Sequence, residues 1–349
     1  MNGAQAVVAC LKEQGVDTVF GYPGGMILPL YDALYDSKEI QQVLVTHEQN
    51  AAHAADGYAR ASGKVGVCIA TSGPGATNLV TGIATAFMDS IPVVAITGQV
   101  DTSLLGRDAF QETDILDVTM PITKHNYKVK DAKLLVSTIR EAFALAKKGR
   151  PGPVLVDVPR DLFFEEVPFA AAAENTRTAG KPDADFLICA AEAAQEIVKA
   201  QRPVVIVGGG VISAGATAEV EAFVEKYNLP VAHTLMGLGA ISREHPQSLG
   251  FAGMHGEKAA NHAIAAADLI IAIGSRFGDR QTGNVKKYTQ DTKFIHIDID
   301  PAEIDKNIGN SLGLAGDMKV ILNLLMKQDA TGHLDEWWQQ IQGWQETYD

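Results

Sequence analysis

Short apolar runs rich in Val and Ile alternate with segments of helical period along the first half of the chain. Each run ends in polar residues, Gly or Pro, as expected where a strand meets a loop. The runs cover residues 16–25, 41–47, 65–75, 91–99 and 152–161. Near-continuous apolar strands are buried on both faces, which indicates a parallel sheet with helices on each side.

A second set of runs follows a break in the pattern. Residues 163–182 have Ala, Glu and Pro without a clear period and are typical of a linker, and apolar runs resume at residues 203–210, 230–237, 269–276 and 293–300. We therefore predict an α/β protein with two doubly wound parallel-sheet domains, residues 1–165 and 186–328, joined by a linker over 166–185. Ligands bind beyond the carboxyl ends of the strands in such sheets.

The C-terminal segment, residues 329–349, predicts an amphipathic helix. An apolar stripe follows a three-then-four spacing through Leu334, Trp337, Ile341, Trp344 and Tyr348. Nothing follows the stripe in this chain, so we expect it to be uncovered and to favour association through that face.

Composition narrows the function classes. The net charge of −13 argues against nucleic acid as a partner, because phosphate binding needs clusters of Lys and Arg. Cys10, Cys68 and Cys189 lie far apart and form no metal or redox spacing, and the sequence predicts no metal ligands. No apolar run reaches the roughly 20 residues that span a bilayer, and the N-terminus has no signal-peptide charge pattern. We expect a cytoplasmic protein that binds neither nucleic acid nor membrane.

Two stretches of the first half are candidates for chemistry. Glu48 opens an alanine-rich helical segment (46–60), where an acid either stabilises the first turn or serves a function. The segment 71–78, TSGPGATN, predicts a tight turn that opens a helix, and 21–25, GYPGG, predicts a similar turn. Glycines at such turns allow a ligand to approach the backbone, although a plain strand-to-helix connection has the same pattern.

The second half contains three strand-end motifs. GGGVISAGAT (208–217) lacks the Lys of a phosphate-binding loop, and Ser213 replaces the third Gly of an NAD fingerprint, which disfavours a simple NAD fold. GSRFGDR (274–280) is compatible with a binding loop or with a solvated ion pair. In HIDIDPAE (296–303), Asp298 and Asp300 could hold ribose hydroxyls or cap a helix.

Taken together, these motifs resemble those of acetohydroxyacid synthase (acetolactate synthase) large subunits, which are thiamine-diphosphate enzymes. The resemblance rests on FGYPGG, HEQNAAHAADGYAR, ATSGPGATNL, DSIPVVAITGQV, DAFQE, TKHNY, GRPGPVLVDVP, LMGLGA, GMHG, GSRFGDR and HIDIDPAE, in that order, and covers essentially the whole chain. It implies a domain that binds the cofactor's pyrimidine and a central domain that binds FAD. A third domain, which binds the diphosphate through Mg²⁺ in the family, has no counterpart among the motifs, so we expect the isolated chain to be inactive.

The resemblance also implies a reaction. Pyruvate is decarboxylated on thiamine diphosphate and added to a second 2-ketoacid, either pyruvate or 2-ketobutyrate, giving 2-acetolactate or 2-aceto-2-hydroxybutyrate for branched-chain amino acid biosynthesis. FAD has no net redox role in this scheme. A homodimer or homotetramer is implied, and a small regulatory subunit is a possible partner. The alternatives are a catalytically silent FAD-binding or dimerisation module and a pyruvate oxidase-like enzyme; an NAD oxidoreductase is more distant.

Site residues are implied by the same match. Glu48 corresponds to the acid that exchanges a proton with N1′ of the aminopyrimidine ring. The pyrimidine and the reacting carbons would be lined by Tyr22, Pro23, Gly25, Thr71, Pro74, Asn78 and Gln111. Phe110 and Arg276 would shape the pocket for the second substrate. FAD would be held by Arg150, Gly208, Gly209, Gly210, Thr234, Leu235, Met236, Gly253, Met254, His255, Gly274, Arg276, Asp279, Arg280, Asp298 and Asp317.

Two positions depart from the family's pattern. Arg160 occupies a place where the family usually has Lys, at a substrate entrance where the two cations are not interchangeable. Gly278 replaces an Asp of the family's RFDDR loop, which leaves Asp279 as its one acid.

Overall fold

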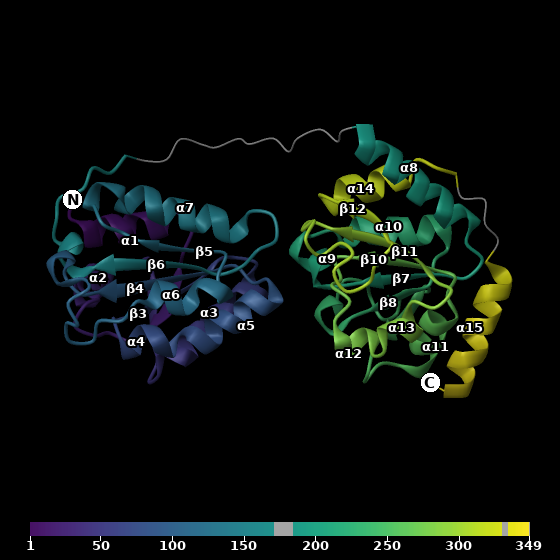
Figure 1. The fold of residues 1–349 in the computed structure, drawn as a ribbon, viewed down its shortest axis with the longest axis horizontal. Coiled ribbons are helices and arrows are strands. Elements are labelled where there is room, and N and C mark those ends of the chain that lie inside the picture. The colour runs from purple at the N-terminus through teal and green to yellow at the C-terminus, as the bar shows by residue number, and fades with distance from the viewer. Residues whose placement is uncertain (171–183, 330–333, 349) are drawn as a thin grey trace. The chain divides into compact units, whose positions relative to one another are not determined.

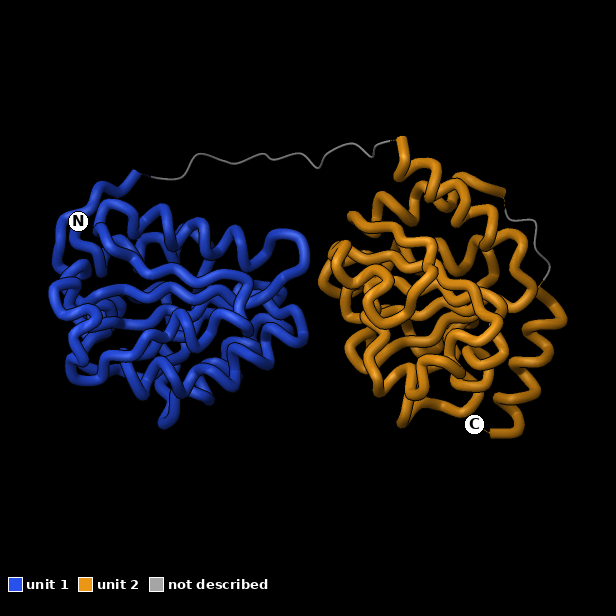
Figure 2. Tube along the Cα trace, in the orientation of Figure 1, with its two compact units in different colours: residues 1–176 blue, residues 177–349 orange. Residues whose placement is uncertain are grey.

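The computed structural model describes residues 1–170, 184–329 and 334–348. The chain divides into two compact units, residues 1–176 (unit 1) and 177–349 (unit 2), shown in Figure 2. The unit boundary lies within the predicted linker, most of which, residues 171–183, is outside the described residues. At its start, Val167 is buried and its N–H donates to Met1 O (3.0 Å), so residues up to 167 pack with unit 1.

Unit 1 is built on a six-stranded, all-parallel sheet with the strand order β2-β1-β3-β4-β6-β5 (Figure 1). Its strands are β1 (Thr18–Gly21), β2 (Gln41–Leu44), β3 (Gly66–Ala70), β4 (Val93–Gln99), β5 (His125–Lys128) and β6 (Val154–Pro159). Its helices are α1 (Gly3–Glu13), α2 (Leu28–Tyr35), α3 (Glu48–Ser62), α4 (Pro74–Asn78), α5 (Val80–Asp89), α6 (Ile115–Thr119) and α7 (Leu135–Lys147).

Alternate residues of the central strands of unit 1 point to opposite faces of the sheet, as the pleat requires. On one face Val67 and Ile69 pack in a core with α1, α2 and α7. On the other face Cys68 and Ala70 pack in a core with α3 and α5. The near-continuous apolar runs of the sequence therefore supply side chains to two hydrophobic cores, one on each face of the sheet.

Unit 2 repeats this architecture with the strand order β12-β11-β10-β7-β8-β9. Its strands are β7 (Pro203–Val207), β8 (Val231–His233), β9 (Ser248–Phe251), β10 (Leu269–Ile273), β11 (Lys293–Asp298) and β12 (Leu312–Ala315). Its helices are α8 (Ala184–Lys199), α9 (Gly209–Ser213), α10 (Thr217–Tyr227), α11 (Lys258–Ala266), α12 (Asp279–Thr282), α13 (Val285–Tyr288), α14 (Met318–Leu325) and α15 (Asp335–Tyr348).

The predicted α/β fold with two doubly wound parallel sheets is confirmed. Three strands were not predicted: β5, β9 and β12, which form three of the four sheet edges. Their sequences, HNYK, SLGF and LGLA, are only four residues long and contain no Val or Ile; the first two include polar residues, and LGLA is apolar but short. An edge strand is less completely covered by helices, so its sequence carries a weaker apolar signal.

The C-terminal helix forms as predicted, but the expectation that its stripe is uncovered is wrong. Trp337 is 2% exposed and Ile341 is fully buried, both within the core of unit 2. The Trp337 indole N–H donates to Pro203 O (3.0 Å), and His262 of α11 stacks on Trp344 and Tyr348 with ring centroids 5.6 and 5.0 Å away. The covering surface is α11 and the start of β7, which the stripe's spacing alone does not reveal. None of the described helices has the length and hydropathy needed to cross a bilayer.

Candidate functional site

The predicted pyrimidine residues of unit 1 lie at a topological switch point. The chain passes from β1 to β2 on one side and continues through β3 on the other, so β1 and β3 are neighbours whose following loops diverge. The loop after β1 carries Tyr22, Pro23 and Gly25, and the loop after β3 carries Thr71 and Pro74. This crevice beyond the carboxyl ends of the strands is where doubly wound sheets bind ligands.

Glu48 is the first residue of α3 and is 8% exposed. The helix start is fixed by His47, whose ring Nδ1 accepts a hydrogen bond from Gln49 N (3.1 Å). Asn78, at the end of α4, donates through Nδ2 to Glu48 Oε2 (2.9 Å), and no hydrogen bond of the described residues reaches Oε1. One oxygen of the carboxylate is thus oriented by an amide while the other stays available.

Gly75 leaves the space in front of that available oxygen open. A Cβ atom at Gly75 would lie 3.3 Å from Glu48 Oε1 and 2.7 Å from Thr71 Cγ2. The TSGPG turn therefore requires Gly75 for its close packing against Thr71. A flat ring could reach Glu48 across this turn without meeting a side chain at position 75.

The two loops contact each other through Thr71. Its hydroxyl accepts a hydrogen bond from Met26 N (3.2 Å), and a Cβ atom at Gly24 would lie 2.5 Å from Thr71 Cγ2. Next to it, Ser72 is 1% exposed and its hydroxyl has no hydrogen-bond partner among the described residues. A buried hydroxyl without a partner is costly unless a ligand or water completes its hydrogen bonds. Together with the available Glu48 oxygen, it fits a site for a polar ring.

Tyr31 of α2 packs against the apolar core beside this site. Its hydroxyl donates to Ile69 O (3.4 Å), and burial, followed by the charges of Cys68 and Glu48, raises its pKa. The phenol therefore stays protonated at neutral pH. Tyr22, by contrast, is 43% exposed and connects to β3 through its backbone N–H, which donates to Ile69 O (3.3 Å).

Gln111 is brought to the same turn by the loop that follows β4. Its backbone has φ = +58°, and a Cβ atom at Gly73 would lie 2.6 Å from Gln111 O. Phe110 beside it is 81% exposed. Arg160, after β6, stacks over the Phe164 ring (5.3 Å) and is not placed at the Glu48 crevice by any contact.

Sequence reasoning missed a buried carboxyl group on β6, the strand next to the sheet edge formed by β5. Asp157 of β6 is fully buried, and its two oxygens accept hydrogen bonds from Thr97 Oγ1 (2.7 Å) and Gln99 Nε2 (3.0 Å) of β4. Burial raises the pKa of Asp157 to about 7. The Asp within the apolar run VLVDVP was the available signal, because a lone acid in a doubly covered strand must find buried partners.

In unit 2 the predicted glycines meet at the corresponding switch point, between β7 and β10. A Cβ atom at Gly208 would lie 2.1 Å from Gly274 O, and one at Gly210 would lie 2.7 Å from Gly274 Cα. Gly274 itself has φ = +58°. These three glycines are therefore required for backbone packing between the two strand ends. A Cβ atom at Gly209 would be 3.1 Å from Met236 Cβ, a milder contact.

Apolar side chains and a cation are exposed at this carboxyl edge. Leu235 is 69%, Met236 36% and Met254 59% exposed, and Arg280 Nη1 lies 3.8 Å from Met254 Sδ. Gly253 has φ = +120°, and a Cβ atom at this position would lie 2.9 Å from Arg280 O. The backbone of Gly253 therefore packs closely against that of Arg280. A cavity of about 570 Å³ adjoins Leu235 at the ends of β8 and β9. Exposed apolar groups beside a cation fit an aromatic ligand that carries phosphate.

Other residues assigned to FAD have partners within the protein. Thr234 Oγ1 accepts from Gly237 N (3.1 Å), and Asp317 caps α14 by accepting from Lys319 N (2.9 Å). Asp298 is 8% exposed, accepts from Asp300 N (3.0 Å), and has its pKa raised by burial. Asp279 and His255 are exposed. The Asp300 carboxylate accepts from Ala302 N (3.0 Å), but residues 301–306 form turns, so no helix begins there for Asp300 to cap.

Two predicted groups of residues, the FAD set and the pair Phe110 and Arg276, are divided between the units. Arg150 lies in unit 1, where its Nε donates to Ser90 Oγ (2.8 Å), whereas the other residues assigned to FAD lie in unit 2. Phe110 lies in unit 1 and Arg276 in unit 2. The structure of each unit does not bring the members of these pairs together.

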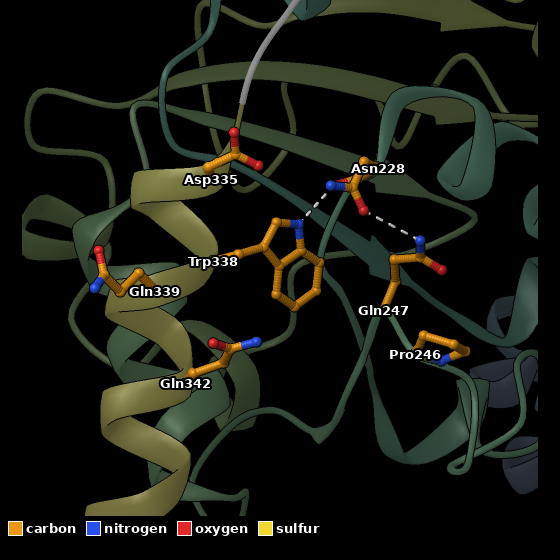
Figure 3. A pocket seen from close by; sticks show the side chains of 7 residues that line it. All are labelled: Asn228, Pro246, Gln247, Asp335, Trp338, Gln339 and Gln342. Carbon is orange, nitrogen blue, oxygen red and sulfur yellow. Dashed lines mark hydrogen bonds between the residues drawn. The ribbon is translucent and has the colours of Figure 1, made fainter.

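A second cavity of unit 2, about 390 Å³, lies at the opposite edge of the sheet (Figure 3). Its lining residues Asn228 and Gln247 lie in the segments that lead into β8 and β9, and the indole of Trp338 points toward Asn228, whose O accepts its N–H (2.9 Å). The amino-terminal edge of a parallel sheet is not where such folds bind ligands. Within the described ranges, no group of three His, Cys, Asp or Glu residues could hold a metal ion.

Comparison with known protein families identifies the class of enzyme to which the two units are similar. The model of the thiamine pyrophosphate enzyme N-terminal TPP-binding domain matches residues 1–118, and that of the thiamine pyrophosphate enzyme central domain matches residues 190–325. The chain therefore belongs to the thiamine pyrophosphate enzymes, and the resemblance read from its motifs is confirmed.

Within this class its relatives are acetolactate synthases. The chain is 50% identical over 335 residues to a probable acetolactate synthase large subunit of Methanocaldococcus jannaschii, covering 93% of this chain and 56% of the relative. It is 48% identical over 355 residues to a Mycobacterium tuberculosis acetolactate synthase large subunit (100% and 57%). It is 46% identical over 359 residues to the Escherichia coli acetolactate synthase isozyme 3 large subunit (99% and 62%). The chain thus spans somewhat more than half the length of these relatives.

Proposed function

We propose that this chain takes part in acetolactate synthesis, with unit 1 binding the aminopyrimidine half of thiamine diphosphate at the Glu48 crevice. One observation carries the proposal: Asn78 holds Glu48 Oε2 at 2.9 Å, while Oε1 faces the space that Gly75 leaves open. The relatives' names, acetolactate synthase, supply the reaction class.

When bound, thiamine diphosphate supplies a carbon centre that stabilises the negative charge released when a 2-ketoacid loses carbon dioxide. Glu48 would exchange a proton at Oε1 with a nitrogen of the bound pyrimidine ring. Asn78 keeps the carboxylate in the orientation that this exchange requires, because its amide occupies Oε2. Thr71 and Ser72 provide hydroxyls beside the ring, and their burial excludes water from the contact.

Gln111 and Phe110 are the residues of unit 1 that we assign to the substrate side. The contact between Gln111 and Gly73 places this loop against the turn that carries Ser72 and Pro74. The exposed Phe110 ring offers an apolar surface for the alkyl group of a ketoacid. Pyruvate as the acceptor gives 2-acetolactate, and 2-ketobutyrate gives 2-aceto-2-hydroxybutyrate.

Unit 2 would bind FAD at the carboxyl edge of β7, β8 and β10. Leu235, Met236 and Met254 fit an apolar ring system, and Arg276 and Arg280 supply cations for the phosphates. Gly208, Gly210 and Gly274 would contribute by keeping the strand ends close together, with Gly209 as the glycine that faces the ligand. Mg²⁺ would be held outside the residues assigned here. We also infer a homo-oligomer and, since the relatives are named large subunits, a small-subunit partner.

The test is acetolactate formation from pyruvate with thiamine diphosphate, Mg²⁺ and FAD, measured as acetoin after acid treatment. The chain is assayed alone and with a separately expressed C-terminal part of the Escherichia coli relative, beyond the matched region. We expect product in the supplemented assay and its loss on Glu48→Gln. Absence of product in both assays, with the full-length relative active as a positive control, would contradict the proposal.

A further inference from the structure

The loop between β4 and α6, residues 100–114, has a strained geometry at the residues that face the candidate site. Asp108 and Gln111 both have positive φ, +54° and +58°. Residues other than Gly adopt this region at a cost, and they keep it only where surrounding contacts hold them. Some group must therefore hold the turn that carries Phe110 and Gln111.

Glu112 supplies that contact. Its carboxylate accepts hydrogen bonds from three backbone N–H groups: Gly106 N (2.5 Å), Ala109 N (3.0 Å) and Arg107 N (3.3 Å). Its own N–H donates to Ala109 O (2.9 Å). In the part of the chain that the structure describes, no other side chain bonds to the backbone between residues 103 and 111. The turn of residues 106–112 is thus closed by one carboxylate.

The two ends of the same loop are held separately. Gln99 Nε2 donates to Thr113 O (2.9 Å) while also donating to Asp157, and Thr102 N donates to Asp161 Oδ1 (3.0 Å). The ends are therefore bound to β4 and to the segment after β6. Only the middle of the loop, which carries Phe110 and Gln111, depends on Glu112.

The charge of Glu112 suits this task. A carboxylate that accepts several N–H hydrogen bonds is stabilised in its ionised form, and these donors lower the pKa of Glu112. A glutamine at this position would keep the size but offer one acceptor oxygen and would point an NH₂ group at a backbone donor.

We infer that Glu112 is a positioning residue of the proposed carboligation: it holds the 106–112 turn, which carries Phe110 and brings Gln111 against Gly73. This inference rests on the proposed function, because the roles of Phe110 and Gln111 do. Glu112 itself contacts neither substrate nor cofactor. Its effect is on which ketoacid is accepted and how well the reacting groups are aligned.

The first measurement is amide hydrogen exchange in the 349-residue chain, with Glu112→Gln compared with the wild type. We expect the Gly106 and Ala109 amides to exchange at least about tenfold faster in the variant, because a charge-assisted hydrogen bond is lost. Glu39→Gln is the matched control, since Glu39 is exposed and pairs only with Lys12. Unchanged exchange at both amides would overturn the inference.

The second measurement is the product ratio when pyruvate and 2-ketobutyrate compete as acceptors, in the supplemented assay described above. We expect Glu112→Gln to shift the ratio several-fold, whereas mere loss of folded protein would lower both products equally. An unchanged ratio overturns the positioning role. If the wild type forms neither product, the proposed function fails, and the exchange experiment alone decides whether Glu112 holds the turn.

Discussion

Replacing Trp337 tests whether the C-terminal helix belongs to the core of unit 2. Trp337 is 2% exposed, and its indole N–H donates to Pro203 O at 3.0 Å. Trp337→Ala should therefore lower the free energy of unfolding of unit 2 by about 3–5 kcal/mol, the usual cost of removing a buried tryptophan. Trp337→Phe keeps most of the ring but loses the hydrogen bond, which should cost about 1–3 kcal/mol.

Tryptophan fluorescence during urea denaturation provides the assay. All three tryptophans, Trp337, Trp338 and Trp344, lie on α15, so the signal reports on unit 2 and persists in each variant. Gln342→Ala is the control on the exposed side of the same helix and should change the free energy of unfolding by less than about 0.5 kcal/mol. If Trp337→Ala is as mild as the control, the stripe is not part of this core and our account of α15 is wrong.

Three other predictions address the candidate sites. Glu48→Gln should remove most acetolactate formation and leave the unfolding transition unchanged; near-normal turnover would contradict the proton exchange proposed for Oε1. Because burial raises the pKa of Asp157 to about 7, folded unit 1 retains a proton that the unfolded chain releases near pH 4. The free energy of unfolding of unit 1 should therefore fall, by up to about 4 kcal/mol, as the pH rises from about 4 to 7. Asp157→Asn should flatten this dependence in denaturation followed by circular dichroism, and equal slopes in the two proteins would refute it. Reconstitution with excess FAD should give a yellow chain, with weaker binding in Arg276→Glu; a colourless wild type would exclude our assignment of unit 2.

Much of the fold could be predicted because most of its strands are buried on both faces. Runs such as VGVCIA and LIIAI leave few alternatives to a central parallel strand, and their Gly-rich ends indicated the edge where ligands bind. The edge strands β5, β9 and β12 were missed because four residues without Val or Ile are too short to show a period that distinguishes a strand from a loop. The apolar spacing of α15 predicted a helix, but it could not say which surface covers that helix.

The residues of the candidate sites also differ in how far the sequence could predict them. Glu48, Gly75 and Asn78 could be named from motifs, and the structure brings them together at one switch point. The partnership of Glu112 with Gly106, Arg107 and Ala109 has no sequence signature, because a side chain that binds backbone N–H groups leaves no pattern in residue type. The same holds for Gly208 and Gly210, whose contact with Gly274 depends on two strand ends that are more than 60 residues apart in the sequence.

The two switch points differ in charge, and this difference constrains what each can bind. At the first, the structure assembles a carboxylate, an amide and small hydroxyls, a set that suits a weakly basic ring and repels phosphate. At the second, arginines accompany exposed apolar groups, a set that suits an aromatic ligand with phosphates. If thiamine diphosphate binds to unit 1 as proposed, its ring and not its diphosphate must face Glu48. The diphosphate then requires cationic or metal-bearing groups other than those beside Glu48. Affinity for thiamine diphosphate should therefore depend far more on those groups than on Glu48, whereas turnover should depend on Glu48.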